Sequence, residues 1–136
     1  MAAWAALGLV TVAQAGGAFA ILSVAPLSPF LVDTLRLSRV EAGLFLPAAY
    51  LGGVLMSLPA GWLSDRLGVR LTLGCGLAVI AGMLAASAFA GDLPAFLGCL
   101  VLAGFGFSVL NPTTGRAVVE WFPPHRRGVA MGIKQT

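Results

Sequence analysis

Charged side chains are scarce in this sequence. Asp, Glu, Lys and Arg make up 10% of its 136 residues, whereas 59% are hydrophobic. A soluble domain usually carries about 25% charged residues. A soluble fold of this length would therefore lack the polar side chains needed to cover its surface. The composition predicts an integral membrane protein whose solvent is the lipid bilayer.

Residues that bind metals or carry redox chemistry are also few. His125 is the only histidine, and Cys75 and Cys99 both lie inside apolar runs without the spacing of metal ligands. We interpret the two cysteines as small buried thiols, although a disulfide between them stays open. The sequence therefore predicts no metal site, no cofactor and no catalytic residue, and we expect no enzyme activity.

The basic residues give a net charge of +3, but they sit in short clusters between apolar runs. That arrangement is typical of membrane loops, and no aromatic residues are interleaved with the clusters as in RNA-binding proteins. We therefore predict no nucleic-acid partner. Residues 1–32 contain no Lys or Arg, so the basic region of a signal peptide is missing, and we interpret this stretch as a retained first span.

Four apolar stretches reach the length of about 20 residues that a helix needs to cross a bilayer. They lie at about residues 5–30, 40–62, 71–91 and 94–115, and a fifth apolar segment begins at residue 128. The sequence thus predicts an all-α membrane fold with four complete spans and the start of a fifth. Because the last segment stops in the middle of a helix-like run, we expect the chain to be incomplete.

Two local features of the sequence concern the start of the second span and the packing of the helices. Ser38 and Glu41 have the spacing of a helix capping box just before the second span. The sequence holds 18 glycines, and many of them fall within the predicted spans. Because lipid provides no hydrophobic drive between helices, we expect small residues to bring the helix backbones into close contact. The alternative is that glycine is merely tolerated within these spans and has no packing role.

The arginines predict the orientation of the chain. With a cytoplasmic N-terminus, the inner loops hold five arginines and the outer loops hold two. The inner group is Arg66, Arg70, Arg116, Arg126 and Arg127, and the outer group is Arg36 and Arg39. Positive charge accumulates on the cytoplasmic side of membrane proteins. We therefore expect a multi-pass protein of the plasma membrane with its N-terminus inside.

The loop after the second span is unusually dense in charge and glycine. Residues 61–73 read Gly-Trp-Leu-Ser-Asp-Arg-Leu-Gly-Val-Arg-Leu-Thr-Leu. Gly61 and Gly68 allow the backbone to bend and pack closely. Arg66 and Arg70 hold the loop on the cytoplasmic side. The residues themselves predict a tight turn between antiparallel helices, and an ordinary positive loop is the alternative.

This loop resembles the signature between the second and third spans of the major facilitator superfamily. The matching residues are Gly61, Leu63, Asp65, Arg66, Gly68, Arg70 and Leu73. Val69 departs from the family pattern, which usually has a basic residue there. Residues 111–136 also resemble the loop between the fourth and fifth spans of many bacterial members. Leu100 stands where many proton-coupled members carry an arginine, which argues against arginine-based coupling at that position.

The resemblance implies a fold and a function. The chain would be part of the N-terminal six-helix bundle of a twelve-span transporter, with the missing C-terminal half as its partner. Such a protein is a secondary active transporter that moves a small solute by alternating access, so the isolated chain would be inactive. The bacterial inner membrane would be its location. Asp65 would pair across the two halves, within a gating motif formed with Gly61, Arg66, Gly68 and Arg70.

Polar residues at membrane depth are costly and are therefore candidates for the substrate cavity. They are Gln14 in the first span, Tyr50 in the second, Ser108 and Asn111 in the fourth, and Lys134 in the fifth segment. Interhelical hydrogen bonds are the alternative for each. Ser108 and Asn111 are three residues apart and would share one helix face. A lone lysine at this depth favours an anionic solute, unless it reaches the interface or pairs with a carboxylate elsewhere.

Two other readings and one internal similarity stay open. A channel or another polytopic membrane protein is the alternative function, because Asn111-Pro112-Thr113 faintly resembles a pore-loop turn. The segments 23–26 and 108–112 each combine serine and proline after a glycine-rich stretch. They would correspond to each other in a repeated fold, or they resemble one another by chance.

Overall fold

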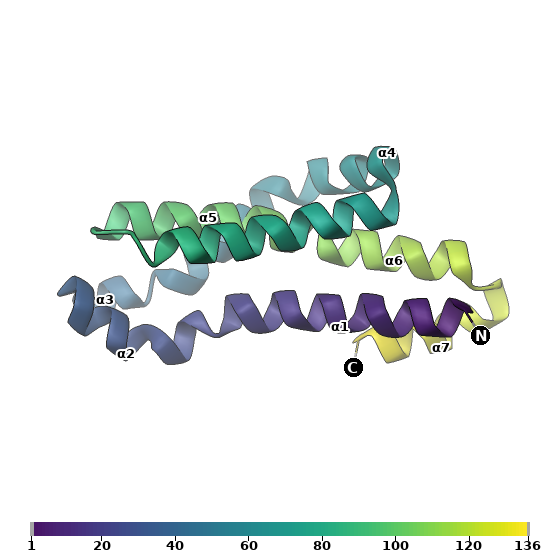
Figure 1. Ribbon diagram of the computed structural model, residues 1–136, viewed down its shortest axis with the longest axis horizontal. Helices are drawn as coiled ribbons and strands as arrows, with labels where there is room; N and C mark the ends of the chain where they lie inside the picture. The colour runs from purple at the N-terminus through teal and green to yellow at the C-terminus, as the bar shows by residue number, and fades with distance from the viewer. Residues whose placement is uncertain (1, 136) are drawn as a thin grey trace.

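The computed structural model describes residues 2–135, which within these limits form seven helices and no strand (Figure 1). The helices are α1 (Ala2–Leu22), α2 (Val24–Leu35), α3 (Arg39–Ala42), α4 (Phe45–Ser87), α5 (Leu93–Ser108), α6 (Leu110–Trp121) and α7 (Pro124–Gln135). The all-α fold that the composition predicts is confirmed. Three helical segments are long and apolar enough to cross a membrane, namely Ala3–Leu35, Arg39–Ser87 and Leu93–Trp121.

The middle segment folds back on itself at Gly68. This glycine has φ 76° and ψ 166°, a backbone conformation that only glycine adopts readily. It divides α4 into a first arm, residues 45–67, and a second arm, residues 69–87, which run in opposite directions (Figure 1). The turn between the predicted second and third spans is thus tighter than the sequence suggests, because one residue reverses the chain.

Prolines interrupt the predicted first and fourth spans at matching positions. The break between α1 and α2 falls at Ser23, three residues before Pro26, and the break between α5 and α6 falls at Val109, three residues before Pro112. Proline has no backbone N–H, so it cannot continue the helical hydrogen bonds. In both cases the residue after the proline donates its N–H to the carbonyl at the break, at 3.3 and 3.2 Å. This shared geometry supports the internal similarity between the two segments.

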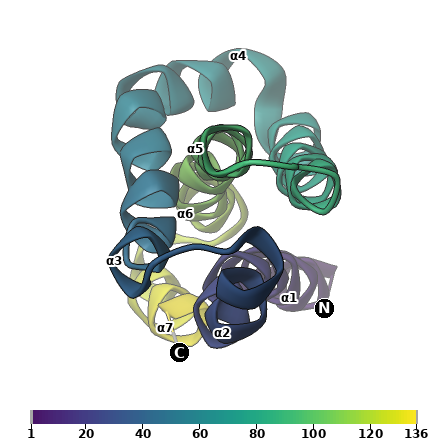
Figure 2. The ribbon, with the colours of Figure 1, turned by 90° about the vertical axis from the view of Figure 1, so that its left-hand side faces the viewer.

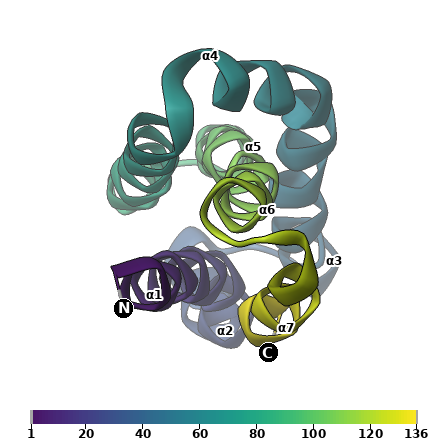
Figure 3. The same cartoon turned by 90° about the vertical axis from the view of Figure 1, so that its right-hand side faces the viewer.

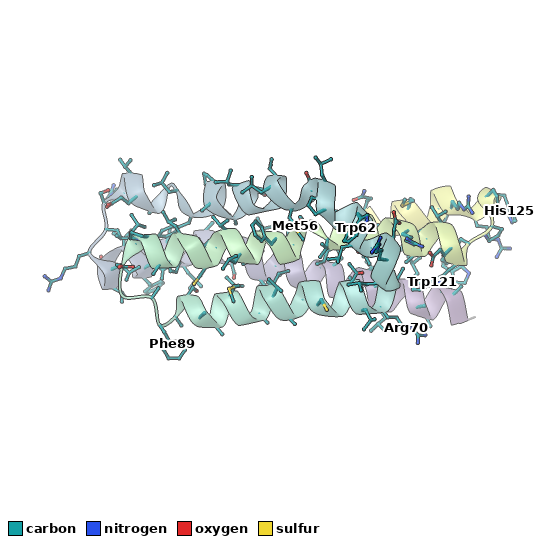
Figure 4. The ribbon with its side chains drawn as sticks, turned by 90° about the horizontal axis from the view of Figure 1, so that it is seen from above. Met56, Trp62, Arg70, Phe89, Trp121 and His125 are labelled. Carbon is teal, nitrogen blue, oxygen red and sulfur yellow. The ribbon has the colours of Figure 1, made fainter. Side chains whose placement is uncertain are left out.

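The helices form a bundle with α5 and α6 at its centre. The two arms of α4 flank them, and α1 and α7 lie on the remaining side (Figures 2 and 3). The N-terminus, the Gly68 turn and the link between α6 and α7 lie at one end, whereas α3 and the link between α4 and α5 lie at the other (Figure 1). Arg70, Trp121 and His125 accordingly lie toward the opposite end from Phe89 (Figure 4).

Glycines bring α5 into backbone contact with both arms of α4. A Cβ atom added to Gly52 would lie 1.9 Å from the Val101 carbonyl oxygen, and one added to Gly104 would lie 1.9 Å from the Ala49 carbonyl oxygen. On the second arm, a Cβ at Gly106 would lie 2.5 Å from the Gly76 oxygen. The prediction that small residues mediate helix packing is therefore confirmed for this part of the bundle.

One other local prediction is confirmed, and two are not. Ser38 and Glu41 form both bonds of a capping box, at 2.7 and 3.2 Å, and cap α3. Cys75 and Cys99 are free thiols, but Cys75 is exposed and Cys99 is half-buried, so the prediction that both are buried is wrong for the described chain. Close packing at Gly61 is also wrong for the described residues, because a Cβ there would meet nothing within 4 Å.

We predict that Gly104→Ala lowers the free energy of unfolding by about 1–3 kcal/mol, because the new methyl group would collide with the backbone of Ala49. Gly98→Ala in the same helix is the matched control, since a Cβ at Gly98 has open space. The control should be neutral or slightly stabilising, by up to about 1 kcal/mol of helix propensity. Thermal unfolding of the detergent-purified protein measures both variants, and equal losses would contradict the packing role of Gly104.

Candidate functional site

A cluster of polar side chains joins α1, α6 and α7. The Gln14 amide nitrogen donates to Asn111 Oδ1 at 3.0 Å, and the Thr114 hydroxyl donates to Gln14 Oε1 at 2.6 Å. Lys134 Nζ donates to Asn111 Oδ1 at 3.3 Å and to the Asn111 carbonyl oxygen at 3.5 Å. Three of the predicted cavity residues, from three different helices, therefore meet at one place. We call Gln14, Asn111, Thr114 and Lys134 the polar cluster.

Hydrogen-bond chemistry decides how the amides of the polar cluster are oriented. A lysine ammonium can only donate, so the Asn111 atom that faces it must be the oxygen. An oxygen there requires the Gln14 nitrogen to face it, which turns the Gln14 oxygen toward the Thr114 hydroxyl. Both amide oxygens are thus used within the polar cluster. Within residues 2–135, the Asn111 amide nitrogen has no partner, and Lys134 keeps unused donor capacity.

The surroundings of the polar cluster are partly buried and contain no negative charge. Lys134 is 6% exposed and Thr114 is fully buried, whereas Asn111 is exposed. Among the described residues, Lys134 has no ion-pair partner. Lys134 lies ten residues into α7, or about 15 Å along the helix axis. The polar cluster is therefore a positively charged, donor-rich and partly buried site between α1, α6 and α7.

The elements beside the polar cluster are held in place by contacts near the ends of their helices. Arg127 donates to the carbonyl oxygens of Phe122 and Val119, at 3.0 and 2.9 Å, and so binds the start of α7 to the end of α6. A cation at this position also complements the negative end of the α6 dipole. The Trp4 ring meets the Phe122 ring edge-on, with centroids 4.7 Å apart, and ties α1 to the same corner.

The other two predicted cavity residues lie outside the polar cluster. The Ser108 hydroxyl donates to Phe105 in its own helix, at 2.9 Å. A break in the helix at Val109 lies between Ser108 and Asn111, and only Asn111 joins the polar cluster. That the two residues share one helix face stays a prediction. Tyr50 is 54% exposed on the first arm of α4, and among the described residues its hydroxyl has no hydrogen-bond partner. Thr114 was not predicted, although its place three residues after Asn111 was an available signal.

Asp65 of the charged loop pairs with Arg116 of α6, and its pairing with the missing half of the protein stays a prediction. Arg116 also contacts Glu120 one turn later at 2.5 Å and donates to the Ser64 carbonyl oxygen at 3.3 Å. The guanidinium therefore bridges the first arm of α4 to α6. The Asp65 side chain is 72% exposed, so the pair lies at the surface of the described chain. The pairing role of Arg116 was not predicted from the sequence.

The remaining residues of the charged loop have separate roles. Gly68 makes the turn itself. The Arg66 guanidinium lies over the Trp62 ring, 4.5 Å from its centroid, which is the geometry of a cation–π contact. Arg70 lines an otherwise apolar groove of about 670 Å³ between α1 and the second arm of α4. Within residues 2–135, no three His, Cys, Asp or Glu side chains are grouped so as to hold a metal ion.

The family model of the Major Facilitator Superfamily matches residues 7–136. The chain belongs to this superfamily. The hexuronate transporter of Bacillus subtilis is 33% identical over 112 residues, which cover 82% of this chain and 26% of that protein. An uncharacterised MFS-type transporter of Mycobacterium tuberculosis is 33% identical over 136 residues, which cover 99% of this chain and 30% of that protein. The D-galactonate transporter of Escherichia coli is 29% identical, over 82% of this chain and 26% of that protein.

Membership of the superfamily establishes the general class of the protein. This MFS chain is a multi-pass membrane protein, its relatives are transporters, and it is not an enzyme. The chain spans about 26–30% of the length of these relatives. The match of the family model, which includes the charged loop, confirms the family resemblance of that loop.

We predict that Gln14 and Thr114 are energetically coupled, because the Thr114 hydroxyl donates to Gln14 Oε1 at a partly buried position. Gln14→Leu and Thr114→Val should each destabilise the protein by about 1 kcal/mol, and the double variant should cost less than the sum. Ser108→Ala is the control partner for Gln14→Leu, since the Ser108 hydroxyl bonds within its own helix. Thermal unfolding of the three single variants and of the two double variants, Gln14→Leu with Thr114→Val and Gln14→Leu with Ser108→Ala, gives the coupling. Additive losses for Gln14 and Thr114 would contradict it.

Proposed function

We propose that this chain forms part of a secondary active transporter that moves a small organic carboxylate by alternating access. The observation that carries the proposal is the polar cluster, with its buried Lys134 and its surplus of hydrogen-bond donors. A carboxylate has only acceptors, so it matches the donors that the cluster leaves unused. An ion pair with Lys134 would also offset the cost of removing both charges from water.

Two further facts support a carboxylate. Hexuronate and galactonate, named in the relatives, are both sugar acids that are anionic at neutral pH. The polar cluster uses helices from the first, fourth and fifth predicted spans, so a solute held there would touch several parts of the bundle at once. A solute bound in this way favours one arrangement of the helices over another, which is the requirement for alternating access.

The location and the span count follow from the same proposal. Four crossings, with the Gly68 turn and the α6–α7 link on the cytoplasmic side, would put most arginines inside, which agrees with the positive-inside rule. The N-terminus would then be cytoplasmic, and the bacterial inner membrane would be the site of action. We also infer that residues 1–136 alone insert into the bilayer without transporting, and saturable uptake by this chain in liposomes would contradict that inference.

We predict that Lys134→Gln, made in the complete gene product, weakens the apparent affinity for D-galactonate or D-glucuronate by roughly 30-fold or more, because the carboxylate loses its charged partner. Counterflow in proteoliposomes, compared with neutral D-galactose, measures the effect. Ser108→Ala is the matched control and should leave counterflow unchanged. An equal effect of Lys134→Gln on the neutral sugar, or no effect on either, would contradict carboxylate recognition by this residue.

We further predict that Asp65→Asn slows transport without preventing membrane insertion. The variant removes the negative charge that Arg116 of α6 meets on the first arm of α4, but it keeps the shape of the side chain. An exposed ion pair contributes only about 0–1 kcal/mol, so stability should change little. Glu120→Gln is the control, because it removes the other acidic partner of Arg116 and leaves the link between the helices intact. Equal turnover of the Asp65→Asn variant and wild type would contradict this prediction and would leave the charged loop with a role in membrane topology only.

A further inference from the structure

Lys134 stands apart from every acidic residue of the described chain. The sequence has five acids, namely Asp33, Glu41, Asp65, Asp92 and Glu120. Asp65 and Glu120 are engaged by Arg116, while Glu41 and Asp92 cap the starts of helices. Asp33 lies in α2 and lines a surface pocket with Arg39. Within residues 2–135, the ammonium binds only the neutral Asn111, through its side-chain Oδ1 at 3.3 Å and its backbone carbonyl oxygen at 3.5 Å.

The helices packed against α7 do not supply a counter-charge to Lys134. α1 contains no ionisable side chain. α6 contributes Arg116 and Glu120, which bind each other, and α7 itself adds His125, Arg126 and Arg127 near its start. The charges around the polar cluster are therefore mostly positive. A lone ammonium that is 6% exposed inside a membrane bundle is costly to maintain.

Loss of one proton from the Lys134 ammonium would remove the cost of this isolated charge when no anion is bound. A neutral amine can still donate to Asn111, so the hydrogen bonds of the polar cluster survive. When a carboxylate binds, the charged ammonium becomes the favoured form of Lys134, because the anion supplies the missing counter-charge. The charged form of Lys134 is then stabilised by an ion pair instead of being isolated.

We propose that Lys134 is the group that couples proton movement to carboxylate transport, an inference that rests on the function proposed above. The step is R–NH₂ + H⁺ + R′–COO⁻ → R–NH₃⁺···⁻OOC–R′, in which the amine nitrogen forms one bond to the proton and no bond to carbon changes. The loaded and the empty sites each carry no net charge. Each monovalent carboxylate therefore crosses with one proton, and the empty site returns without moving charge through the hydrocarbon.

Proton uptake on binding tests this coupling directly. The complete gene product, purified in detergent and weakly buffered near neutral pH, is mixed with D-galactonate or D-glucuronate while a pH dye reports proton uptake. Wild type should take up about one proton for each anion bound, because the bound state holds one more proton than the empty state. Lys134→Arg keeps its proton in both states, so its uptake per bound anion should be at least tenfold smaller.

A second measurement covers the case in which the arginine variant binds too weakly. In proteoliposomes, wild-type uptake of either anion should follow an imposed pH gradient and be insensitive to membrane potential. For Lys134→Arg, the ratio of gradient-driven net uptake to anion exchange should fall at least about tenfold, because arginine cannot release the proton on the return step. A wild-type ratio in this variant, or potential-dependent uptake by wild type, would overturn the coupling role of Lys134.

The two proposals fail in different ways. If wild type binds and exchanges neither anion, the proposed carboxylate function is wrong. If wild type binds an anion but takes up no proton, carboxylate transport stands and the coupling through Lys134 is wrong. Proton uptake that persists in Lys134→Arg would assign the proton to another group and would also overturn the coupling.

Discussion

Backbone contact between α5 and α4 is the constraint on which the rest of this structure depends. Gly52 and Gly104 allow two helix backbones to approach so closely that neither position has room for a methyl group. Gly76 and Gly106 do the same on the other arm of α4. In a bilayer no hydrophobic force drives helices together, so close van der Waals packing must do so. These contacts hold α5 at the centre of the bundle and thereby decide where α6 lies.

The position of α6 determines both polar features of the molecule. One side of α6 presents Asn111 and Thr114 to Gln14 and Lys134, while Arg116 reaches Asp65 on the first arm of α4. The break at Val109 separates this polar helix from the apolar α5. Pro112 causes the break by removing one backbone donor. A single proline thus separates the part of the fourth segment that packs from the part that carries polar chemistry.

Much of this organisation could be predicted from the sequence, but the partners of the polar residues could not. The cost of polar groups at membrane depth singled out both Ser108 and Asn111. Only the packing of the helices shows that Asn111 joins the polar cluster while Ser108 bonds within its own helix. No local pattern states that Gln14 faces Thr114, because 100 residues separate them. The resemblance of the loop drew attention to Asp65, yet its partner Arg116 came from a different helix and from three-dimensional packing.

The sequence by itself determined the solvent, the class and the elements of this protein. Scarce charge, long apolar runs and the glycine-rich charged loop are local properties, and they are enough to specify a helical membrane protein of the Major Facilitator Superfamily. Only the tertiary structure decided which polar groups meet and which stay apart. The reason is that a buried polar group is stabilised by whichever partner the packing of other helices brings within about 3 Å, and that distance depends on contacts formed elsewhere in the bundle.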